Sequence, residues 1–178
     1  MNRKIIVDNK WLRLCEDQFI LSNGSECTYY HVQKMDAVMA IAIDNSQPEP
    51  STFIVNQYRH PINQNIWQFP IGGFNPDEAD PIDAAKGELL EETGVKVGNF
   101  DYLGSFFADP GFTNQKVHVC ASKDILEITD QQLEDVEVGL TFKKVPVGAV
   151  SEMIKSGEMG DAWGMAGHYY LSLYLKTI

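Results

Sequence analysis

Three glutamates, Glu88, Glu91 and Glu92, are the residues of this chain whose types and spacing best suit chemistry. On an α-helix, residues three and four positions apart face the same side, so Glu88 would lie beside both of the others. Like charges at that spacing are mildly destabilising unless the site faces water or a divalent cation neutralises it. Hard cations such as Mg²⁺ prefer carboxylate oxygens and keep positions open for water and phosphate. The spacing fits either a metal site or a solvated acidic helix face, and the surrounding sequence favours the metal site.

The sequence around the glutamates predicts a helix that begins after Asp80 and ends at Gly94. Asp80 suits the N-cap, and Pro81 suits the first helical position. Gly94 suits a left-handed residue that ends the helix. An apolar stripe at three- and four-residue spacing should face the core, and it consists of Ile82, Ala85 and Leu89.

Before the helix, Pro70, Gly72 and Gly73 predict a stiff loop with few side chains. Because glycine lets backbone approach a ligand closely, the backbone carbonyl groups of this loop could approach a metal ion. Strand, glycine loop and acid-bearing helix together would form a platform for a metal ion and a phosphate.

This arrangement resembles the Nudix box, whose pattern is Gly, five residues, Glu, seven residues, Arg-Glu, an aliphatic, any residue, Glu-Glu, any residue, Gly and an aliphatic. The right half matches from Glu88 to Val95, whereas the left half departs. A strict count places Gly73 at the first glycine and Ala79 at the isolated glutamate. Aligning the Pro-Ile-Gly turn instead places Gly72 and Glu78 there, with one residue inserted before the helix. We prefer the second frame, because it keeps the proline turn, the glycine and the acid.

Both frames place Gly87 where the Nudix box has arginine. Arginine presents a rigid fork of donors that would hold neighbouring glutamates in place. Glycine removes this support and costs about 1 kcal/mol in a helix interior. Lys86 is adjacent, but it points about 100° away around the helix. Loss of a residue that orients metal ligands typically costs about 10–100-fold, so we expect weakened rather than abolished catalysis.

The composition is that of a globular domain of 178 residues with a net charge of −11. That charge argues against nucleic-acid binding, which needs clustered Lys and Arg. Bound cations would supply the positive charge for a phosphorylated small molecule. Three cysteines without metal-binding spacing are typical of reduced thiols in a cytoplasmic protein. There is no apolar run of 18 residues and no secretory signal, so we expect no membrane contact.

Strand-like and helix-like segments alternate along the chain. The pattern predicts an α+β fold, an α/β/α sandwich around a mixed β-sheet as in Nudix proteins, with a small N-terminal antiparallel β-region. We assign residues 1–35 to the N-terminal strands and residues 36–178 to a Nudix hydrolase domain. Expected strands include 28–32, 37–43, 52–58, 102–107, 116–121 and 141–145, and expected closing helices are 147–155 and 161–176.

The resemblance extends beyond the box and covers most of the chain. QYRHPINQNIWQFPIGG (57–73) is similar to the segment before the box in ADP-ribose pyrophosphatases, which often carry Gln-Tyr-Arg and then Glu-Leu-Pro-Ala-Gly. Gln68 stands where that subgroup has glutamate. DPGFT (109–113) resembles the subgroup's Ser-Pro-Gly-Phe-Ser, and GEMGDAWGMAG (157–167) is similar to the start of its final helix.

The resemblance implies Mg²⁺-dependent hydrolysis, with Mn²⁺ as a possible substitute, of the pyrophosphate of a nucleoside diphosphate sugar such as ADP-ribose. The products would be a nucleoside monophosphate and a sugar phosphate. Glu88 and Glu92 would ligate the metal together with the Gly72 carbonyl, Glu91 would assist, and Arg59 would contact a phosphate or the terminal sugar. A surface cation at the end of a strand is the alternative reading of Arg59.

Three further residues are candidates for the reaction. In the subgroup, an acidic loop can supply the general base, and Glu134 is our nominee over Asp135 and Glu137, with a solvated charged loop as the alternative. Trp67, and with it Trp11, would stack on a base, although core packing is the commoner fate of tryptophan. Gly111, in the turn of DPGFT, is a candidate substrate contact.

Two other functions stay open. Gly87, together with Gln115 where the subgroup often has glutamate, is compatible with a binding or regulatory module that has lost turnover. The chain is also compatible with a hydrolase of another nucleoside diphosphate derivative, such as a dinucleotide polyphosphate. Enzymes of the resembled subgroup are commonly homodimers in which N-terminal strands reach the partner's site, so we expect a homodimer.

Overall fold

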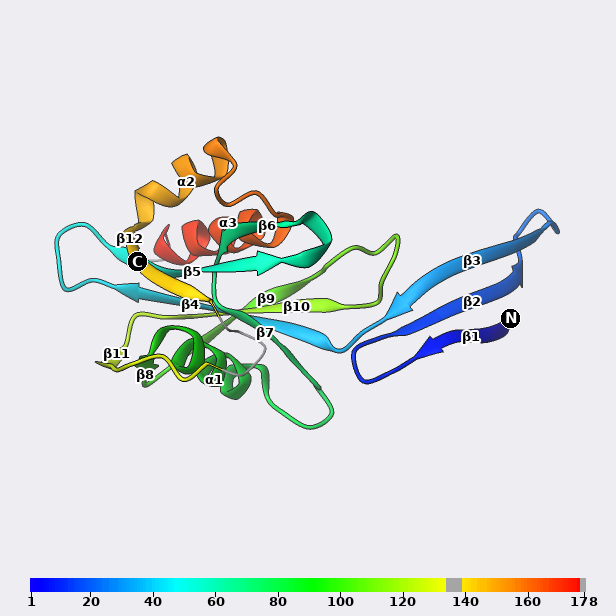
Figure 1. The fold of residues 1–178 in the computed structure, drawn as a ribbon, viewed down its shortest axis with the longest axis horizontal. Coiled ribbons are helices and arrows are strands. Elements are labelled where there is room, and N and C mark those ends of the chain that lie inside the picture. The colour runs from blue at the N-terminus through cyan, green and yellow to red at the C-terminus, as the bar shows by residue number, and fades with distance from the viewer. Residues whose placement is uncertain (134–138, 177–178) are drawn as a thin grey trace.

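The computed structural model describes residues 1–133 and 139–176. A mixed β-sheet lies between helix α1 on one face and helices α2 and α3 on the other (Figure 1). A separate antiparallel sheet precedes these layers and extends away from them. The layers confirm the predicted α+β fold class. None of the described helices is long and apolar enough to cross a membrane.

The elements follow one another along the chain as strands with a few interspersed helices. In chain order they are β1 (Asn2–Asp8), β2 (Arg13–Ile20), β3 (Glu26–Gln33), β4 (Asp36–Asp44), β5 (Ser51–Arg59), the 3₁₀-helix η1 (His60–Ile62), β6 (Gln64–Gln68), β7 (Ile71–Phe74), α1 (Pro81–Thr93), β8 (Val95–Val97), β9 (Asp101–Phe107), β10 (Lys116–Ser122), β11 (Ile125–Ile128), β12 (Thr141–Pro146), α2 (Val147–Ser156) and α3 (Ala162–Lys176).

The central sheet has the strand order β12-β5-β4-β10-β9, with β6 paired to β5 and β7 paired to β4. β10 runs parallel to β4, and the other pairs are antiparallel. β4 is apolar and fully buried between its ends because it packs against helices on both faces. Its alternate residues enter two separate core clusters, one beneath α1 and one beneath α2 and α3. This strand is therefore the rigid base for the elements that carry the site.

Helix α1 has the predicted ends. Asp80 accepts a hydrogen bond from the backbone N–H of Ile82, and Gly94 has a left-handed conformation with φ of 69°. Ala85 and Leu89 are fully buried in the core cluster beneath the helix. This packing fixes which side of the helix faces the sheet, and therefore where its glutamates lie.

Helix α3 lies close to the opposite face of the sheet because two of its residues are glycines. A Cβ at Gly167 would lie 2.5 Å from Sδ of Met39 and 2.7 Å from Cδ2 of Phe69. A Cβ at Gly164 would lie 2.6 Å from Cγ of Met159. A larger residue at position 167 would push the helix away from the sheet, and one at position 164 would displace the side chains of Met159 and Asp161.

The main departure from the expected fold concerns the glycine segment before α1. We predicted a loop there, but residues Ile71–Phe74 form strand β7, which pairs with β4. Glycine is depleted in strands, so the local sequence argues against this strand, and long-range pairing overrides that preference. Strands β8 and β11 were also missed; they are short and pair only with each other.

A smaller difference concerns the start of the second strand. Residues 11–14 (WLRL) are β-prone and favour a strand that begins at Trp11, but β2 begins only at Arg13. The side chain of Asn9 accepts hydrogen bonds from the backbone N–H groups of Trp11 (2.8 Å) and Leu12 (3.1 Å). This asparagine turn competes with the sheet ladder and leaves Trp11 exposed.

Candidate active site

Glu92 is a buried carboxylate on the face of α1 that meets the sheet. Its side chain is only 1% exposed, and Oε2 accepts a hydrogen bond of 3.0 Å from the backbone N–H of Ile71. An ionised carboxylate is rarely buried unless a charge or a hydrogen bond compensates it. The burial excludes a solvated acidic face as the explanation of Glu92.

Glu88 lies one turn earlier on α1 and packs directly against Gly72 of β7. A Cβ at Gly72 would lie 1.8 Å from Oε1 and 2.3 Å from Oε2 of Glu88, so any side chain there would displace the carboxylate. At Gly73 the corresponding position is open, because its nearest neighbour, the carbonyl oxygen of Asp36, is 3.9 Å away. The close contact favours the alignment that places Gly72, rather than Gly73, at the first glycine of the box.

The pairing of β7 with β4 decides which backbone carbonyl groups face the glutamates. Ala40 N–H donates to the Pro70 carbonyl oxygen (2.9 Å), whereas Ile71 N–H points away from β4 toward Glu92. Backbone groups of an antiparallel strand alternate between its two edges. This alternation turns the Gly72 carbonyl toward β4 and the Ile71 carbonyl toward α1. The geometry therefore argues against the Gly72 carbonyl as a metal ligand and in favour of that of Ile71.

The donor set fits a hard cation that is held partly by substrate. Within residues 1–133 and 139–176, no three His, Cys, Asp or Glu side chains form a ready-made metal cluster. Glu88 and Glu92 instead offer two carboxylates next to a strand edge with an outward carbonyl group. Mg²⁺ is typically bound through one or two carboxylates, with phosphate and water completing its shell. Nudix enzymes generally use divalent cations, and these residues are compatible with one.

Glu91 lies on the same turn, partly exposed, and is the nearest residue to the open side of Gly87. A Cβ at Gly87 would lie 3.9 Å from Oε1 of Glu91, which is an ordinary contact distance. The helix backbone therefore leaves room for a larger residue at this position. Crowding therefore does not explain why glycine, and not arginine, occupies position 87.

Arg59, at the end of β5, is half-buried and belongs to a chain of hydrogen bonds across three elements. Its Nε donates to Oε1 of Gln68 (2.7 Å), and Nε2 of Gln68 donates to Oδ2 of Asp161 (2.5 Å). Burial lowers the pKa of Arg59, while the negative charges of Glu92 and Asp161 act in the opposite direction. A guanidinium remains protonated despite such a shift. The site thus combines a fixed positive charge with the carboxylates of α1.

Two adjoining clefts share Arg59 and Trp163. The first has a volume of about 330 Å³, and its lining includes Trp11, Lys34, Arg59, Ile71, Gly72 and Trp163. The second has a volume of about 340 Å³, and its lining includes Arg59, Ile62, Ile66, Gln68, Asp161 and Trp163. The first cleft contains the strand edge against which Glu88 packs, and the second is the more apolar of the two.

Trp67 and Gly111 lie apart from both clefts. Trp67 packs against the core cluster beneath α2 and α3, and Nζ of Lys143 lies 3.9 Å from its ring centroid. The Gly111 carbonyl oxygen accepts a hydrogen bond of 2.5 Å from the hydroxyl of Tyr29 in the N-terminal sheet. The structure therefore does not bring these two candidates together with Arg59 and the α1 glutamates.

Trp163 is the aromatic residue that the sequence analysis missed. It belongs to the first turn of α3, two residues after Asp161, whose Oδ1 accepts a hydrogen bond from Gly164 N–H (3.1 Å). The Gly-Asp-Ala-Trp-Gly run could have indicated this residue. Aspartate is a preferred N-cap and marks the start of a helix. The glycines beside it allow that helix end to approach a sheet. Trp11, the alternative to Trp67, does line the first cleft.

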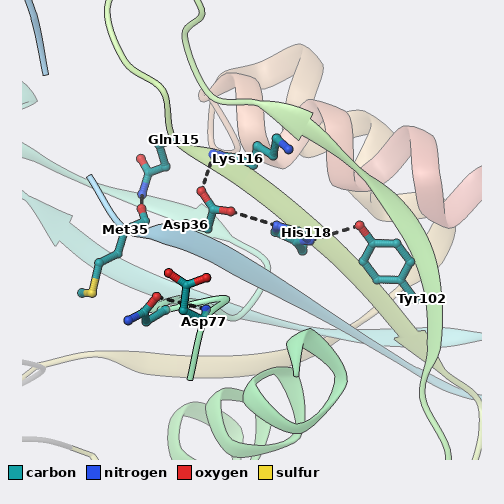
Figure 2. Close-up of polar contacts among 8 residues, drawn as sticks. Met35, Asp36, Asp77, Tyr102, Gln115, Lys116 and His118 are labelled. Carbon is teal, nitrogen blue, oxygen red and sulfur yellow. Dashed lines mark hydrogen bonds and ion pairs between the residues drawn. The ribbon is translucent and has the colours of Figure 1, made fainter. Parts of the chain in front are cut away.

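Residues 109–116 join the N-terminal sheet to the first cleft. Val32 N–H donates to the Phe112 carbonyl oxygen (2.8 Å), and Lys34 N–H donates to Oδ1 of Asn114 (3.1 Å). Nε2 of Gln115 donates to the Met35 carbonyl oxygen (2.8 Å), as Figure 2 shows. A glutamate at position 115 would lack this donor when ionised. Gln115 is thus a structural contact here.

Next to this junction, Asp36 begins a network that links β4, β10 and β9 (Figure 2). Its Oδ1 accepts from Lys116 N–H (3.0 Å), and its Oδ2 lies 3.1 Å from Nε2 of His118. Nδ1 of His118 lies 3.0 Å from the Tyr102 hydroxyl. The network fixes the start of β4, where the first cleft begins.

Glu134, the nominated general base, lies outside the described residues. The chain just before it runs along the last turn of α1, since Nε2 of Gln131 donates to the Glu92 carbonyl oxygen (2.5 Å). Gln132 N–H donates to the Glu91 carbonyl oxygen (2.8 Å). The role of Glu134 stays a prediction.

Comparison with known proteins identifies the family of the chain. A family profile described as NUDIX domain matches residues 33–154. The chain is 26% identical over 154 residues to an ADP-ribose pyrophosphatase of Mycobacterium tuberculosis, covering 86% of this chain and 73% of that protein. It is 28% identical over 168 residues to a methanol dehydrogenase activator of Bacillus methanolicus, covering 94% and 89%. The fold of a solved ADP compounds hydrolase matches with a TM-score of 0.83, at 15% identity, over 99% of this chain and 93% of that one. Because the profile spans more than half of the sequence, the chain belongs to the Nudix hydrolase family.

Proposed function

We propose that this Nudix hydrolase cleaves the pyrophosphate bond of a nucleoside diphosphate sugar such as ADP-ribose, with Mg²⁺ as the cation and Mn²⁺ as a possible substitute. The observation that carries the proposal is the placement of Glu88 and Glu92 against the edge of β7, beside a cleft that also contains Arg59. The relative that is named an ADP-ribose pyrophosphatase aligns over most of the chain and supports this substrate class.

The two clefts suit a substrate with two different ends. The diphosphate would lie in the first cleft, which contains Arg59 and the Gly72 strand edge against which Glu88 packs. The second cleft offers the apolar side chains of Ile62 and Ile66 and the indole of Trp163, which suit a planar base. Trp163 takes the stacking role in this proposal, because it lines both clefts whereas Trp67 lines neither.

In the reaction, water oxygen bonds to one phosphorus of the diphosphate, and the bond from that phosphorus to the bridging oxygen breaks. The bridging oxygen leaves with the other phosphate, and the water proton passes to a base, for which Glu134 is our nominee. Glu88, Glu92 and the Ile71 carbonyl would hold the cation, which supplies Lewis-acid polarisation of phosphoryl oxygens and lowers the pKa of bound water. Arg59 would bind the phosphate that carries the developing negative charge.

A turnover assay on purified protein tests the proposal. ADP-ribose, other nucleoside diphosphate sugars and a dinucleotide polyphosphate would each be incubated with Mg²⁺ or Mn²⁺, and nucleoside monophosphate release would be followed. We expect turnover of the diphosphate sugars that stops when the cation is chelated. Preferred cleavage of the polyphosphate would instead identify the other class of hydrolase. If the compounds bind but none of them is turned over, the enzymatic proposal is wrong.

Gly87 favours a second candidate function, a ligand-binding or regulatory module with weakened turnover. We expect Gly87→Arg to raise kcat/KM about tenfold, because a guanidinium beside Glu91 would restore a support of the kind that typically contributes about 10–100-fold. The open space at Gly87 lets the side chain enter without displacing the helix. Steady-state kinetics on ADP-ribose would measure the change.

Gly87→Ala is the matched control. Alanine gains about 1 kcal/mol of helix stability over glycine, which corresponds to about 2–4 °C in the midpoint of thermal unfolding, without adding a charge. A rate increase in the alanine variant equal to that in the arginine variant would show that helix stability, and not the guanidinium, limits activity. An unchanged rate in both variants would show that another residue already orients the carboxylates.

We further propose that two copies pair through the N-terminal sheet. Every residue of β1 is exposed, and its apolar side chains Ile5, Ile6 and Val7 are 41–48% exposed in the single chain. Such a row of apolar side chains on an edge strand favours pairing with another chain. Light scattering at micromolar concentration should give twice the mass of 20.0 kDa, and Ile5→Lys should lower it. A single-chain mass for the unmodified protein would contradict the homodimer.

A further inference from the structure

We infer that Gln68 and Asp161 act as a coupled pair that positions the Arg59 guanidinium, with the negative charge of the pair placed on residue 161 instead of residue 68. The inference concerns how the guanidinium is held. Only its effect on KM rests on the proposed function, in which Arg59 binds a substrate phosphate.

The first step is the direction of the hydrogen bonds. Arginine can only donate and an ionised carboxylate can only accept, so the Gln68 amide has a single productive orientation between them. Its Oε1 must face Nε of Arg59, at 2.7 Å, and its Nε2 must face Oδ2 of Asp161, at 2.5 Å. The other carboxylate oxygen of Asp161 accepts from Gly164 N–H at 3.1 Å. Each member therefore constrains the next, from the first turn of α3 to the end of β5.

The second step is burial. Gln68 is 4% exposed, so its amide cannot exchange these partners for bulk water without cost. Among residues 1–133 and 139–176, the hydrogen bond of the Arg59 side chain to Gln68 is made through Nε. The two terminal amino groups at the end of the side chain take no part in that bond. Because Arg59 lines both clefts, those amino groups are the part of the fork available to a phosphate. The pair thus fixes the stem of the guanidinium and leaves its end for ligand.

The third step is charge. A glutamate at position 68 would place its carboxylate against Asp161, and two carboxylates in contact cannot both stay ionised without moving apart. It would also add a negative charge beside a cleft that must accept a diphosphate. The neutral amide of Gln68 avoids both effects and still links Arg59 to a single carboxylate. Residues 68 and 161 should therefore tolerate exchange of the amide and the acid but not two acids or two amides.

A charge-swap cycle tests the coupling. In Gln68→Glu, two acids meet. In Asp161→Asn, two amides meet. Gln68 and Gly164 donate to different carboxylate oxygens of Asp161, so the NH₂ group of the asparagine must face one of these two donors. We expect each single variant to raise KM for ADP-ribose by about tenfold or more, with kcat changed less than about threefold.

The double variant Q68E/D161N restores the pairing with the charge moved across it. The carboxylate introduced at position 68 can accept from Arg59 and also from the amide introduced at position 161. KM should therefore return to within about threefold of the unmodified protein. A double variant no better than the worse single variant would overturn the pairing.

A spectroscopic readout makes the test independent of turnover. In ¹⁵N-labelled protein, the Nε–H resonance of Arg59 should be resolved and protected from solvent exchange because it is hydrogen-bonded to a buried amide. We expect it to be lost in Gln68→Met, which removes the acceptor of Nε–H, and to be retained in the charge-swapped double variant, in which the carboxylate at position 68 accepts instead. If it persists in Gln68→Met, Gln68 does not hold Arg59 and the inference is wrong. If the resonance behaves as expected but no diphosphate is hydrolysed, the positioning stands and the proposed function fails.

Two further variants keep the test decisive. Should Gln68→Glu fail to fold, Gln68→Met removes both hydrogen bonds with little change of volume, and it should give the same rise in KM. Arg59→Lys removes the fork, so adding Q68E to it should no longer raise KM further. A purely structural role for Gln68 predicts instead the same additional loss in both backgrounds.

Discussion

Glu92→Gln should lower the turnover of ADP-ribose by about 10²–10³-fold, because a ligand charge that polarises a phosphoryl group contributes several kcal/mol. The fold should survive, since the amide oxygen of glutamine can still accept the hydrogen bond that Ile71 N–H donates to Oε2 of Glu92. Loss of the charge also leaves Arg59 without one of the two carboxylates that stabilise its protonated form. Kinetics with saturating Mg²⁺ and the midpoint of thermal unfolding would measure both effects.

Asp83→Asn is the matched control for this variant. Asp83 is an exposed carboxylate in the first turn of the same helix, so its substitution changes the net charge of the protein by the same amount. We expect its turnover to stay within about twofold, because exposed charges are screened by solvent. Glu92→Gln with more than about a third of normal turnover would contradict a role for Glu92 in catalysis.

Gly72→Ala should reduce turnover by about 100-fold through displacement of a single carboxylate. A Cβ at this position would lie 1.9 Å from Cδ of Glu88, so the side chain of Glu88 must leave the strand edge. The carboxylate group of Glu88 is at the flexible end of its side chain and can move aside. The protein should therefore fold with nearly unchanged stability. Binding of Mn²⁺, followed by electron paramagnetic resonance, should weaken in parallel with turnover, since the displaced carboxylate is a proposed ligand.

Gly73→Ala provides the comparison on the neighbouring residue. The nearest heavy atom to its added Cβ would be 3.9 Å away, so we expect turnover within about threefold of the unmodified protein. The two substitutions also test the alignment of the box, because the strict count assigns the essential glycine to Gly73. Equal losses in both variants would mean that loss of strand flexibility, and not displacement of Glu88, inactivates the protein.

The parts of the site that could be predicted from sequence are those that depend on local interactions. The α1 helix follows from an N-cap, an N-terminal proline and a C-terminal glycine, all within reach of their own turn. The spacing of Glu88 and Glu92 on that helix follows from its geometry alone. Arg59 was also identified, although only through its resemblance to a motif, and the structure places it in both clefts.

The parts that could not be predicted depend on pairing between distant segments. Whether the Gly72 or the Ile71 carbonyl faces α1 is decided by the register of β7 against β4, which local sequence does not encode. Gln68 and Asp161 are 93 residues apart, so their hydrogen bond exists only after α3 packs on the sheet. The same packing brings Trp163 to the clefts and leaves Trp67 outside both of them, so the stacking candidate among the tryptophans could not be chosen from local sequence.

A crystal structure with Mg²⁺ and a non-hydrolysable ADP-ribose analogue tests the central claim most directly. The account predicts an ion bound by the carboxylates of Glu88 and Glu92 and by the Ile71 carbonyl oxygen, with a phosphate oxygen in its shell and the other phosphate contacting Arg59. An ion and diphosphate bound elsewhere, with Glu88 turned away from Gly72, would contradict the account.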